Sequence, residues 1–283
     1  MNSTTSQNQI TRRDILKSGV LAGAALATGS VLQAGEKKDP YGGFKMGVQS
    51  YSLRGFDVAE ALKHTKTLGL SYWEAYPRHL PMSSVPKNIK EHKKNLAGSG
   101  VTLISYGVLG FDANESKARQ AFDFAKAMGI KALSANPKKD KATFDLLDKL
   151  CDEYQVGIGI HNHGPKATYD KIDDTVNMVK DRHPLVGACV DTGHYLRSSE
   201  DPVEALERLK DRLYGVHLKD VKNTNIFKIL GEGDLDVLGC LKVLKKIDYK
   251  YCLSLEYEEN PKNPLSDIEA CLRTVRQAVK KLE

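Results

Sequence analysis

The feature that most constrains the fold of this chain is a regular alternation of short apolar runs with longer amphipathic stretches from Phe44 onward. Short apolar runs are typical of buried parallel strands, and amphipathic stretches are typical of the helices that cover such strands. The repeat is about thirty residues long, the size of one βα unit. Eight strands are expected, at Lys45–Tyr51, Tyr72–Tyr76, Thr102–Val108, Ala132–Asn136, Val156–Asn162, Val186–Thr192, Leu213–Lys219 and Tyr251–Tyr257.

Helix boundary signals agree with this division. Three pairs have capping-box spacing: Asp57 with Glu60, Asp112 with Glu115, and Ser266 with Glu269. Asp201-Pro202 places a cap and a first-turn proline at another helix start, and Gly69, Gly100 and Gly129 are expected to end helices. Residues 35–283 are therefore predicted to form a single α/β domain, a (β/α)₈ TIM barrel. The alternative is a doubly wound open sheet, although no G-x-G-x-x-G sequence follows the first strand.

The N-terminal segment does not fit the repeat. Thr11–Lys17 contains Arg12 and Arg13 and resembles the twin-arginine export signal, and the apolar stretch Ser18–Ala34 is shorter than a typical membrane span. Residues 1–34 are therefore expected to be an export signal, with the protein periplasmic or otherwise exported. Cleavage after Ala34 would leave no stable membrane association; Leu32 is a poor match to the cleavage pattern, and a retained anchor is the alternative.

Composition excludes several classes of protein. The chain is 41% hydrophobic and 28% charged, without a low-complexity tract, as expected for a packed domain. The net charge of +6 is modest, and the lysines at 87, 90, 93 and 94 lack the arginine and aromatic neighbours of a nucleic-acid surface. The five cysteines have no C-x-x-C spacing, so buried free thiols are expected: Cys151, Cys189, Cys240, Cys252 and Cys271.

Polar residues end the last four expected strands, where barrel enzymes place their catalytic groups. The segments are His161-Asn162-His163, Asp191-Thr192-Gly193-His194, His217-Leu218-Lys219 and Glu256-Tyr257-Glu258. Strand alternation places small residues such as Cys189 and Ser254 beneath these polar ends. Two imidazoles and two carboxylates converging there would suit manganese, zinc, cobalt or iron. The alternative is that each side chain is hydrogen-bonded separately, which four successive strands of this kind disfavour.

Five segments together carry a family resemblance: Asp191-Thr192-Gly193-His194, His217-Leu218-Lys219-Asp220, Leu255-Glu256, Gly231-Glu232-Gly233-Asp234 and Trp73-Glu74. They resemble the xylose isomerase-like sugar isomerase/epimerase superfamily over nearly all of the chain from Phe44. The resemblance implies that Asp191, His217 and Glu256 bind one divalent metal ion, and that His194 and Lys219 face the substrate. Epimerases of the superfamily usually have a glutamate as the fourth ligand, and His161 stands in that position here.

The histidine changes the expected chemistry, because a metal-bound imidazole cannot accept the proton that a second carboxylate accepts in two-base epimerases. Glu256 is then the leading base, with His194 and Lys219 as acids or substrate anchors. Isomerase, lyase or dehydratase chemistry next to a carbonyl is favoured over epimerisation. The expected partner is a small carbohydrate: a sugar, an inositol or a keto-glycoside.

Further substrate contacts are assigned to Glu74, His163 and Glu258, and a salt-bridged strand-end residue is an equal alternative for Glu74. The long loop at Val221–Asp236 is a candidate lid, and its Gly231-Glu232-Gly233-Asp234 segment is expected to be a turn because it lacks the spacing of a phosphate loop.

Two other functions remain open. One is a catalytically silent sugar-binding barrel. The other is an endonuclease IV-like nuclease, for which the second, third and fourth strands end in too few ligands: Glu74, Ser105-Tyr106 and Asn136. Nucleic acid is therefore not an expected partner. No oligomeric state can be inferred from the sequence.

Replacing Arg12 and Arg13 together by lysine tests the export signal. The change preserves the charge but removes the paired arginines, so the protein should stay in the cytoplasm. Cell fractionation of the host organism measures this, with the unchanged chain as the control. Unchanged export of the double variant would mean that the segment is not a twin-arginine signal.

Overall fold

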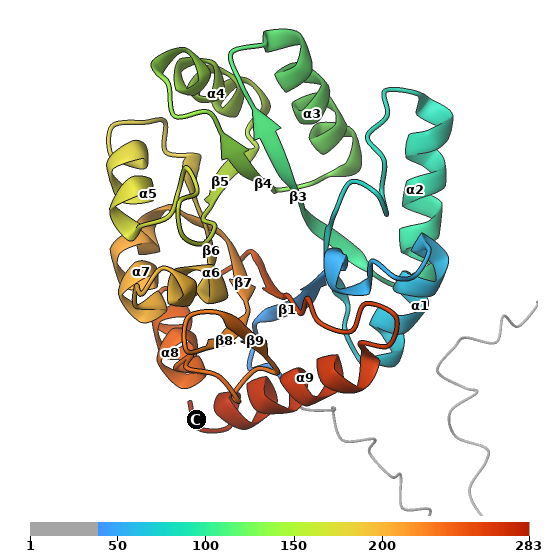
Figure 1. Cartoon of the computed structure of the whole chain (residues 1–283). Helices are drawn as coiled ribbons and strands as arrows, with labels where there is room; N and C mark the ends of the chain where they lie inside the picture. The colour runs from blue at the N-terminus through green and yellow to red at the C-terminus, as the bar shows by residue number, and fades with distance from the viewer. Residues whose placement is uncertain (1–38, 283) are drawn as a thin grey trace, which may run out of the picture. The chain divides into compact units, whose positions relative to one another are not determined.

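The computed structural model describes residues 39–282, which contain eight parallel strands closed into a barrel with helices on the outside (Figure 1). Around the barrel the strands follow the order β1-β10-β7-β6-β5-β4-β3-β2. The (β/α)₈ prediction is confirmed, and the closed order excludes a doubly wound open sheet. The barrel strands are β1 (Lys45–Gln49), β2 (Tyr72–Ala75), β3 (Thr102–Phe111), β4 (Ala132–Pro137), β5 (Gly157–His161), β6 (Val186–Asp191), β7 (Leu213–Leu218) and β10 (Cys252–Leu255). The predicted export signal lies outside the described residues.

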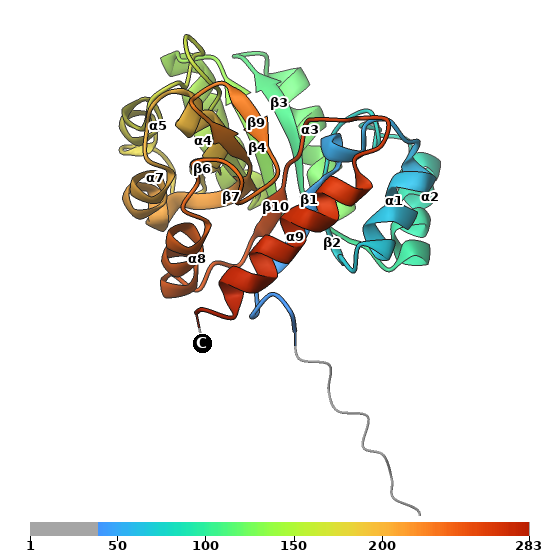
Figure 2. The same cartoon turned by 60° about the horizontal axis from the view of Figure 1, so that its bottom comes forward.

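The helices cover the barrel with their apolar faces. In α3, for example, Ala118, Phe122 and Ala125 recur at helical spacing and are all buried. None of the described helices is long and apolar enough to cross a membrane. The helices are α1 (Val58–Thr67), α2 (Pro86–Ser99), α3 (Glu115–Met128), α4 (Lys141–Tyr154), α5 (Ile172–Val179), α6 (Thr192–Arg197), α7 (Pro202–Leu209), α8 (Val237–Lys246) and α9 (Leu265–Val279), with short 3₁₀ turns η2 (Ser50–Leu53) and η3 (Lys210–Arg212). Figure 2 shows α9 running along the outside of the barrel beside β10.

Two of the three predicted capping boxes are wrong. The Asp57–Glu60 box forms as predicted at the start of α1. Asn114, and not Asp112, caps α3 by accepting a hydrogen bond from the Lys117 backbone, because the helix begins later than the spacing indicated. The third box fails because α9 begins at Leu265 and includes Ser266 in its first turn. The predicted cap at Asp201 and the left-handed glycines at 69, 100 and 129 are all observed.

Small residues in the barrel interior make room beneath the polar strand ends, as predicted. A Cβ atom at Gly215 would lie 2.7 Å from Cys189 Sγ, and one at Gly159 would lie 3.0 Å from Cys189 Cβ. Cys189 therefore fills the space between β5 and β7. Ser254 is fully buried on β10 and pairs in register with His217 on β7. All five cysteines are buried and free.

The predicted lid loop contains an antiparallel hairpin of β8 (Asp220–Lys222) and β9 (Ile226–Lys228). The Asp220 carboxylate accepts backbone hydrogen bonds from Gly231, Gly233 and Leu235 at 2.8, 3.0 and 3.0 Å. The glycine-rich segment is thus a turn wrapped around Asp220, as predicted. The N–H groups of Gly231 and Gly233 donate to Asp220, and those of Glu232 and Asp234 donate to backbone carbonyls, so the segment does not form a phosphate loop.

Replacing Asp57 by alanine should lower the free energy of unfolding by about 1 kcal/mol, because the change removes the cap of α1. The half-buried Asp112 provides a control, since Asn114 retains the cap of α3 when Asp112 is replaced by alanine. The midpoint of urea unfolding measures both effects. Equal shifts in the two variants would contradict the assignment of these caps.

Candidate metal centre and active-site pocket

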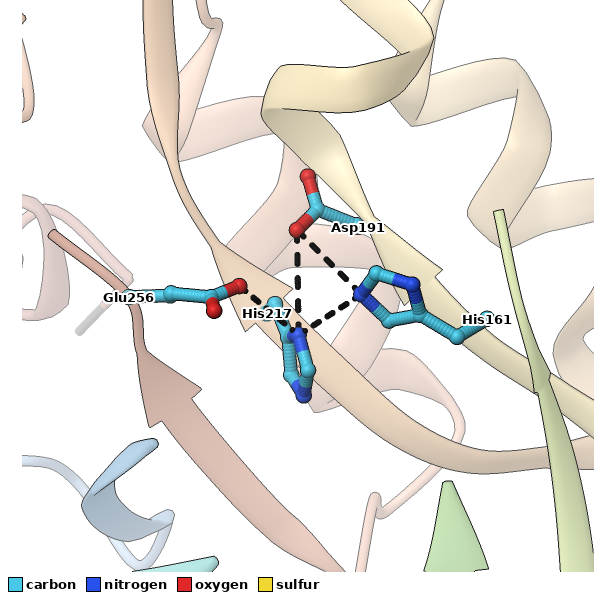
Figure 3. Close-up of side chains that lie close together, drawn as sticks. All are labelled: His161, Asp191, His217 and Glu256. Atoms are coloured by element: carbon cyan, nitrogen blue, oxygen red, sulfur yellow. Dashed lines mark hydrogen bonds and ion pairs between the residues drawn. The ribbon is translucent and has the colours of Figure 1, made fainter. Parts of the chain in front are cut away.

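Four side chains converge at the carboxyl ends of neighbouring strands (Figure 3). His161 ends β5, Asp191 ends β6, His217 lies on β7, and Glu256 directly follows β10. One donor atom from each lies within 4.8 Å of the others, and all four residues are buried. His217 Nδ1 is 3.0 Å from His161 Nε2 and 3.0 Å from Glu256 Oε2. The four predicted ligands are therefore brought together.

The chemistry of these donor atoms fits a divalent cation. Asp191 Oδ1 caps α6 by accepting the His194 backbone N–H at 2.7 Å, whereas the buried Asp191 Oδ2 accepts no hydrogen bond and has only ion-pair contacts, the nearest with Lys219 Nζ at 3.0 Å. Glu256 Oε2 is buried in the same way, with Lys219 Nζ and His217 Nδ1 each 3.0 Å away. Two buried carboxylate oxygens that face two imidazole nitrogens and accept no hydrogen bond fit the N₂O₂ environment of zinc, manganese, cobalt or iron.

Glu74 orients one of these imidazoles from below. Its Oε2 lies 2.9 Å from His217 Nε2, and its carboxylate also accepts from Ser254 at 3.0 Å and Ser134 at 2.5 Å. Burial opposes ionisation of Glu74, but His217 and Ser134 outweigh it, and the pKa of Glu74 is lowered. With the His217 proton on Nε2, its Nδ1 is bare and faces the cluster.

Glu74 is fully buried and does not line the pocket above the cluster. Its contact with His217 is the one expected under the predicted alternative, a salt-bridged strand-end residue, and substrate contact by Glu74 stays a prediction.

Lys219 supplies the positive charge beside the two carboxylates that are predicted ligands. Its Nζ lies 3.0 Å from both Asp191 Oδ2 and Glu256 Oε2 and also contacts Glu258, and the side chain is only 3% exposed. Burial opposes ionisation of Glu256, but Lys219 and His217 lower its pKa to about 2. Burial also opposes ionisation of Asp191, but the charge of Lys219 contributes most to outweighing it, and the pKa of Asp191 is well below its usual value. Both carboxylates are therefore charged at neutral pH.

A cavity of about 430 Å³ lies over this cluster, within the range of small-molecule sites. Its wall includes the predicted substrate-facing residues His163, His194, Lys219 and Glu258, and Glu256 also lines it. Asp191 and His217 are fully buried and do not line the cavity. The pocket thus exposes part of the cluster and keeps the rest from solvent.

The two pocket histidines are neutral near pH 7. Burial and the neighbouring His161 lower the pKa of His163 to about 4, and burial lowers the pKa of His194 to about 3. His163 Nδ1 is 3.4 Å from Nδ1 of His161, so it borders one predicted ligand as well as the pocket. His163 and His194 also stack, with ring centres 5.1 Å apart.

Sequence reasoning missed several pocket residues. Arg197, Phe227, Tyr51 and Gln49 line the same cavity. Arg197 could have been found, because it follows His194 by three residues on an expected helix and so lies on the same helical face. Phe227 reaches the pocket through the β8–β9 hairpin, which has no strong sequence signal.

The fold and the site together are those of a TIM-barrel protein with polar side chains at its strand ends, and comparison with known proteins identifies its family. Residues 62–275 match the family described as the xylose isomerase-like TIM barrel, and the chain belongs to this family. It is 25% identical over 240 residues to an inosose dehydratase of Clostridium perfringens, covering 77% of this chain and 75% of that protein.

Solved structures agree on the fold. An uncharacterised protein of Parabacteroides distasonis superposes with a TM-score of 0.65 at 25% identity, covering 83% of this chain and 99% of the other. A probable 3-DHS dehydratase of Bacillus anthracis gives a TM-score of 0.65 at 15% identity, covering 80% and 97%. The second likeness concerns the fold alone.

Proposed function

We propose that this chain is a divalent-metal-dependent enzyme that removes a proton next to a carbonyl of a sugar, an inositol or a keto-glycoside, with dehydration or isomerisation as the outcome. The observation that carries the proposal is the convergence of His161, Asp191, His217 and Glu256 beneath a pocket walled by possible proton donors. The similarity to an inosose dehydratase supports the dehydratase outcome.

A divalent ion bound by the four residues would supply Lewis acidity, polarising a substrate oxygen so that the neighbouring C–H becomes more acidic. Glu256 is the base in this proposal, because it is an ionised carboxylate that both lines the pocket and reaches the cluster. In a dehydration Glu256 takes the proton, and the departing hydroxyl accepts a proton from the Lys219 ammonium and a hydrogen bond from the neutral His194 as its C–O bond breaks.

Epimerisation by two bases is the less favoured outcome. It needs a second ionised carboxylate free to act on the opposite face of the substrate, and a histidine, His161, stands in the fourth ligand position. The remaining acid in the pocket, Glu258, contacts Lys219. Return of the proton on one face, or elimination, needs only one carboxylate base, Glu256.

A nuclease with three metal ions is disfavoured by the same geometry. Such a site needs additional open ligands from the other strand ends, and the Glu74 carboxylate on β2 already accepts from Ser134, His217 and Ser254. A sugar-binding barrel without catalysis would leave the buried carboxylates of Asp191 and Glu256, which lie beside two imidazoles, without a chemical role. Export through the twin-arginine pathway forms part of the proposal and favours a substrate without phosphate, since sugar phosphates are mainly intracellular.

Calorimetric titration of the metal-stripped protein with Zn²⁺ or Mn²⁺ should give one site per chain. Glu74→Gln should weaken that site by about 10- to 100-fold, because Gln holds His217 less firmly than a carboxylate does. His161→Gln should weaken it further by removing a ligand. His92→Gln on α2 is the control and should bind as the unchanged protein does. Equal affinity in all four proteins would exclude this cluster as the metal site.

Turnover of a keto-inositol or a 3-keto-glycoside in D₂O should introduce deuterium next to the carbonyl, and only when metal is added. His194→Gln or Lys219→Met, each in metal-loaded protein, should slow the chemical step by about 10²-fold or more if that residue acts as the acid. Mass spectrometry and NMR locate the label. Turnover without solvent label would indicate hydride transfer and reject the proton-transfer mechanism while leaving the metal site intact.

A further inference from the structure

Arg197 occupies an unusual position for a pocket arginine. Within residues 39–282 it hydrogen-bonds to an imidazole rather than to a carboxylate: its Nη1 lies 3.1 Å from His194 Nδ1. Both residues belong to α6 and are separated by one helical turn. The contact is therefore built into the helix that follows Asp191.

The guanidinium of Arg197 is held from two sides. Its carbon lies 5.4 Å from the centre of the Phe227 ring, a favourable cation–π arrangement. On another side it packs against Gly164, where an added Cβ atom would lie only 2.8 Å from Arg197 Cζ. Gly164 has no side chain to displace the guanidinium, so the Arg197 geometry depends on this glycine.

The donor properties of arginine decide the role of each His194 nitrogen. A guanidinium donates hydrogen bonds and accepts none, so His194 Nδ1 must be unprotonated to bond with Arg197. A neutral imidazole carries one proton, which then resides on Nε2. The position of the His194 proton therefore follows from the fact that the partner of Nδ1 is an arginine.

Lys219 is the competing donor, because its Nζ lies 3.4 Å from His194 Nε2. An ammonium has three N–H groups. Three carboxylates surround this one at shorter distances: Asp191 and Glu256 at 3.0 Å each, and Glu258 closer still. The Arg197 hydrogen bond to His194, at 3.1 Å, is shorter than the Lys219 contact at 3.4 Å, and among the described residues Arg197 pairs with no carboxylate that competes for its N–H groups.

We propose that Arg197 is a positioning residue that holds His194 as the Nε2-protonated tautomer, with Gly164 providing the space for its guanidinium. His194 then presents an N–H group on its pocket side and can donate a hydrogen bond to a substrate oxygen, but it has no lone pair there to accept a proton. This consequence rests on the proposed function and makes Glu256, not His194, the base.

The test is ¹⁵N NMR of the histidine side chains in the full chain loaded with Zn²⁺, with the His194 signals assigned by their loss in His194→Gln. In the unchanged protein Nδ1 should be bare and Nε2 protonated. In Arg197→Met this preference should be lost, giving a mixture of both tautomers. Gly164→Ala should do the same without altering the arginine. Gly98→Ala is the matched control, since an added Cβ at Gly98 meets nothing within 4 Å.

A protonated Nδ1 in the unchanged protein would overturn the proposal. So would an unchanged His194 tautomer in Arg197→Met or, if that variant does not fold, in Gly164→Ala. These measurements need no substrate, so they stand whether or not the proposed reaction is correct. With an active substrate, Arg197→Met should lower kcat about tenfold or more with little change in KM, because the loss concerns a hydrogen bond that strengthens in the transition state and not uniform binding.

Discussion

The interaction on which the site depends is the buried pairing of Lys219 with the carboxylates of Asp191, Glu256 and Glu258. Removing several charges from water costs free energy unless they compensate one another, and the cost is greatest where the side chains are almost fully buried. Lys219 keeps both predicted ligand carboxylates ionised, while Glu74 holds His217 through a second buried pair. The small interior residues Cys189 and Ser254 make room for this polar layer on top of an apolar barrel.

Most of the fold could be predicted because parallel strands buried on both faces produce continuous apolar runs that stand out from helical patterns. Strand β7, for example, was expected at Leu213–Lys219 and is found at Leu213–Leu218. Strand β3 extends to Phe111, beyond the predicted end at Val108, because it resumes pairing with β4 after a register shift. The failed caps at Asp112 and Ser266 have a different cause, since spacing alone does not fix the residue at which a helix begins. Asn114 caps α3 in place of Asp112, and α9 begins at Leu265 without a side-chain cap.

The four predicted ligands were readable from sequence because each ends its own strand, and parallel strands in a barrel bring such ends together. The residues that contact these ligands could not be predicted from the sequence. Glu74 bonds with His217 across 143 positions of sequence, and Phe227 reaches Arg197 from a hairpin on another part of the chain. Such contacts depend on side-chain packing between distant segments, which periodicity does not report. The contact of Arg197 could be predicted only in part. Helical spacing relates Arg197 to His194, but it does not reveal that Arg197 pairs with no carboxylate among the described residues.

Anomalous X-ray diffraction from crystals grown with Zn²⁺, recorded on both sides of the zinc absorption edge, tests the central claim most directly. The account predicts one strong peak per chain, bonded to His161 Nε2, Asp191 Oδ2, His217 Nδ1 and Glu256 Oε2 at about 2.0–2.2 Å. A second buried group, formed by Glu74, Cys189 and His217, provides an internal comparison. A peak held by that group, or no peak among the four strand-end ligands, would contradict the account.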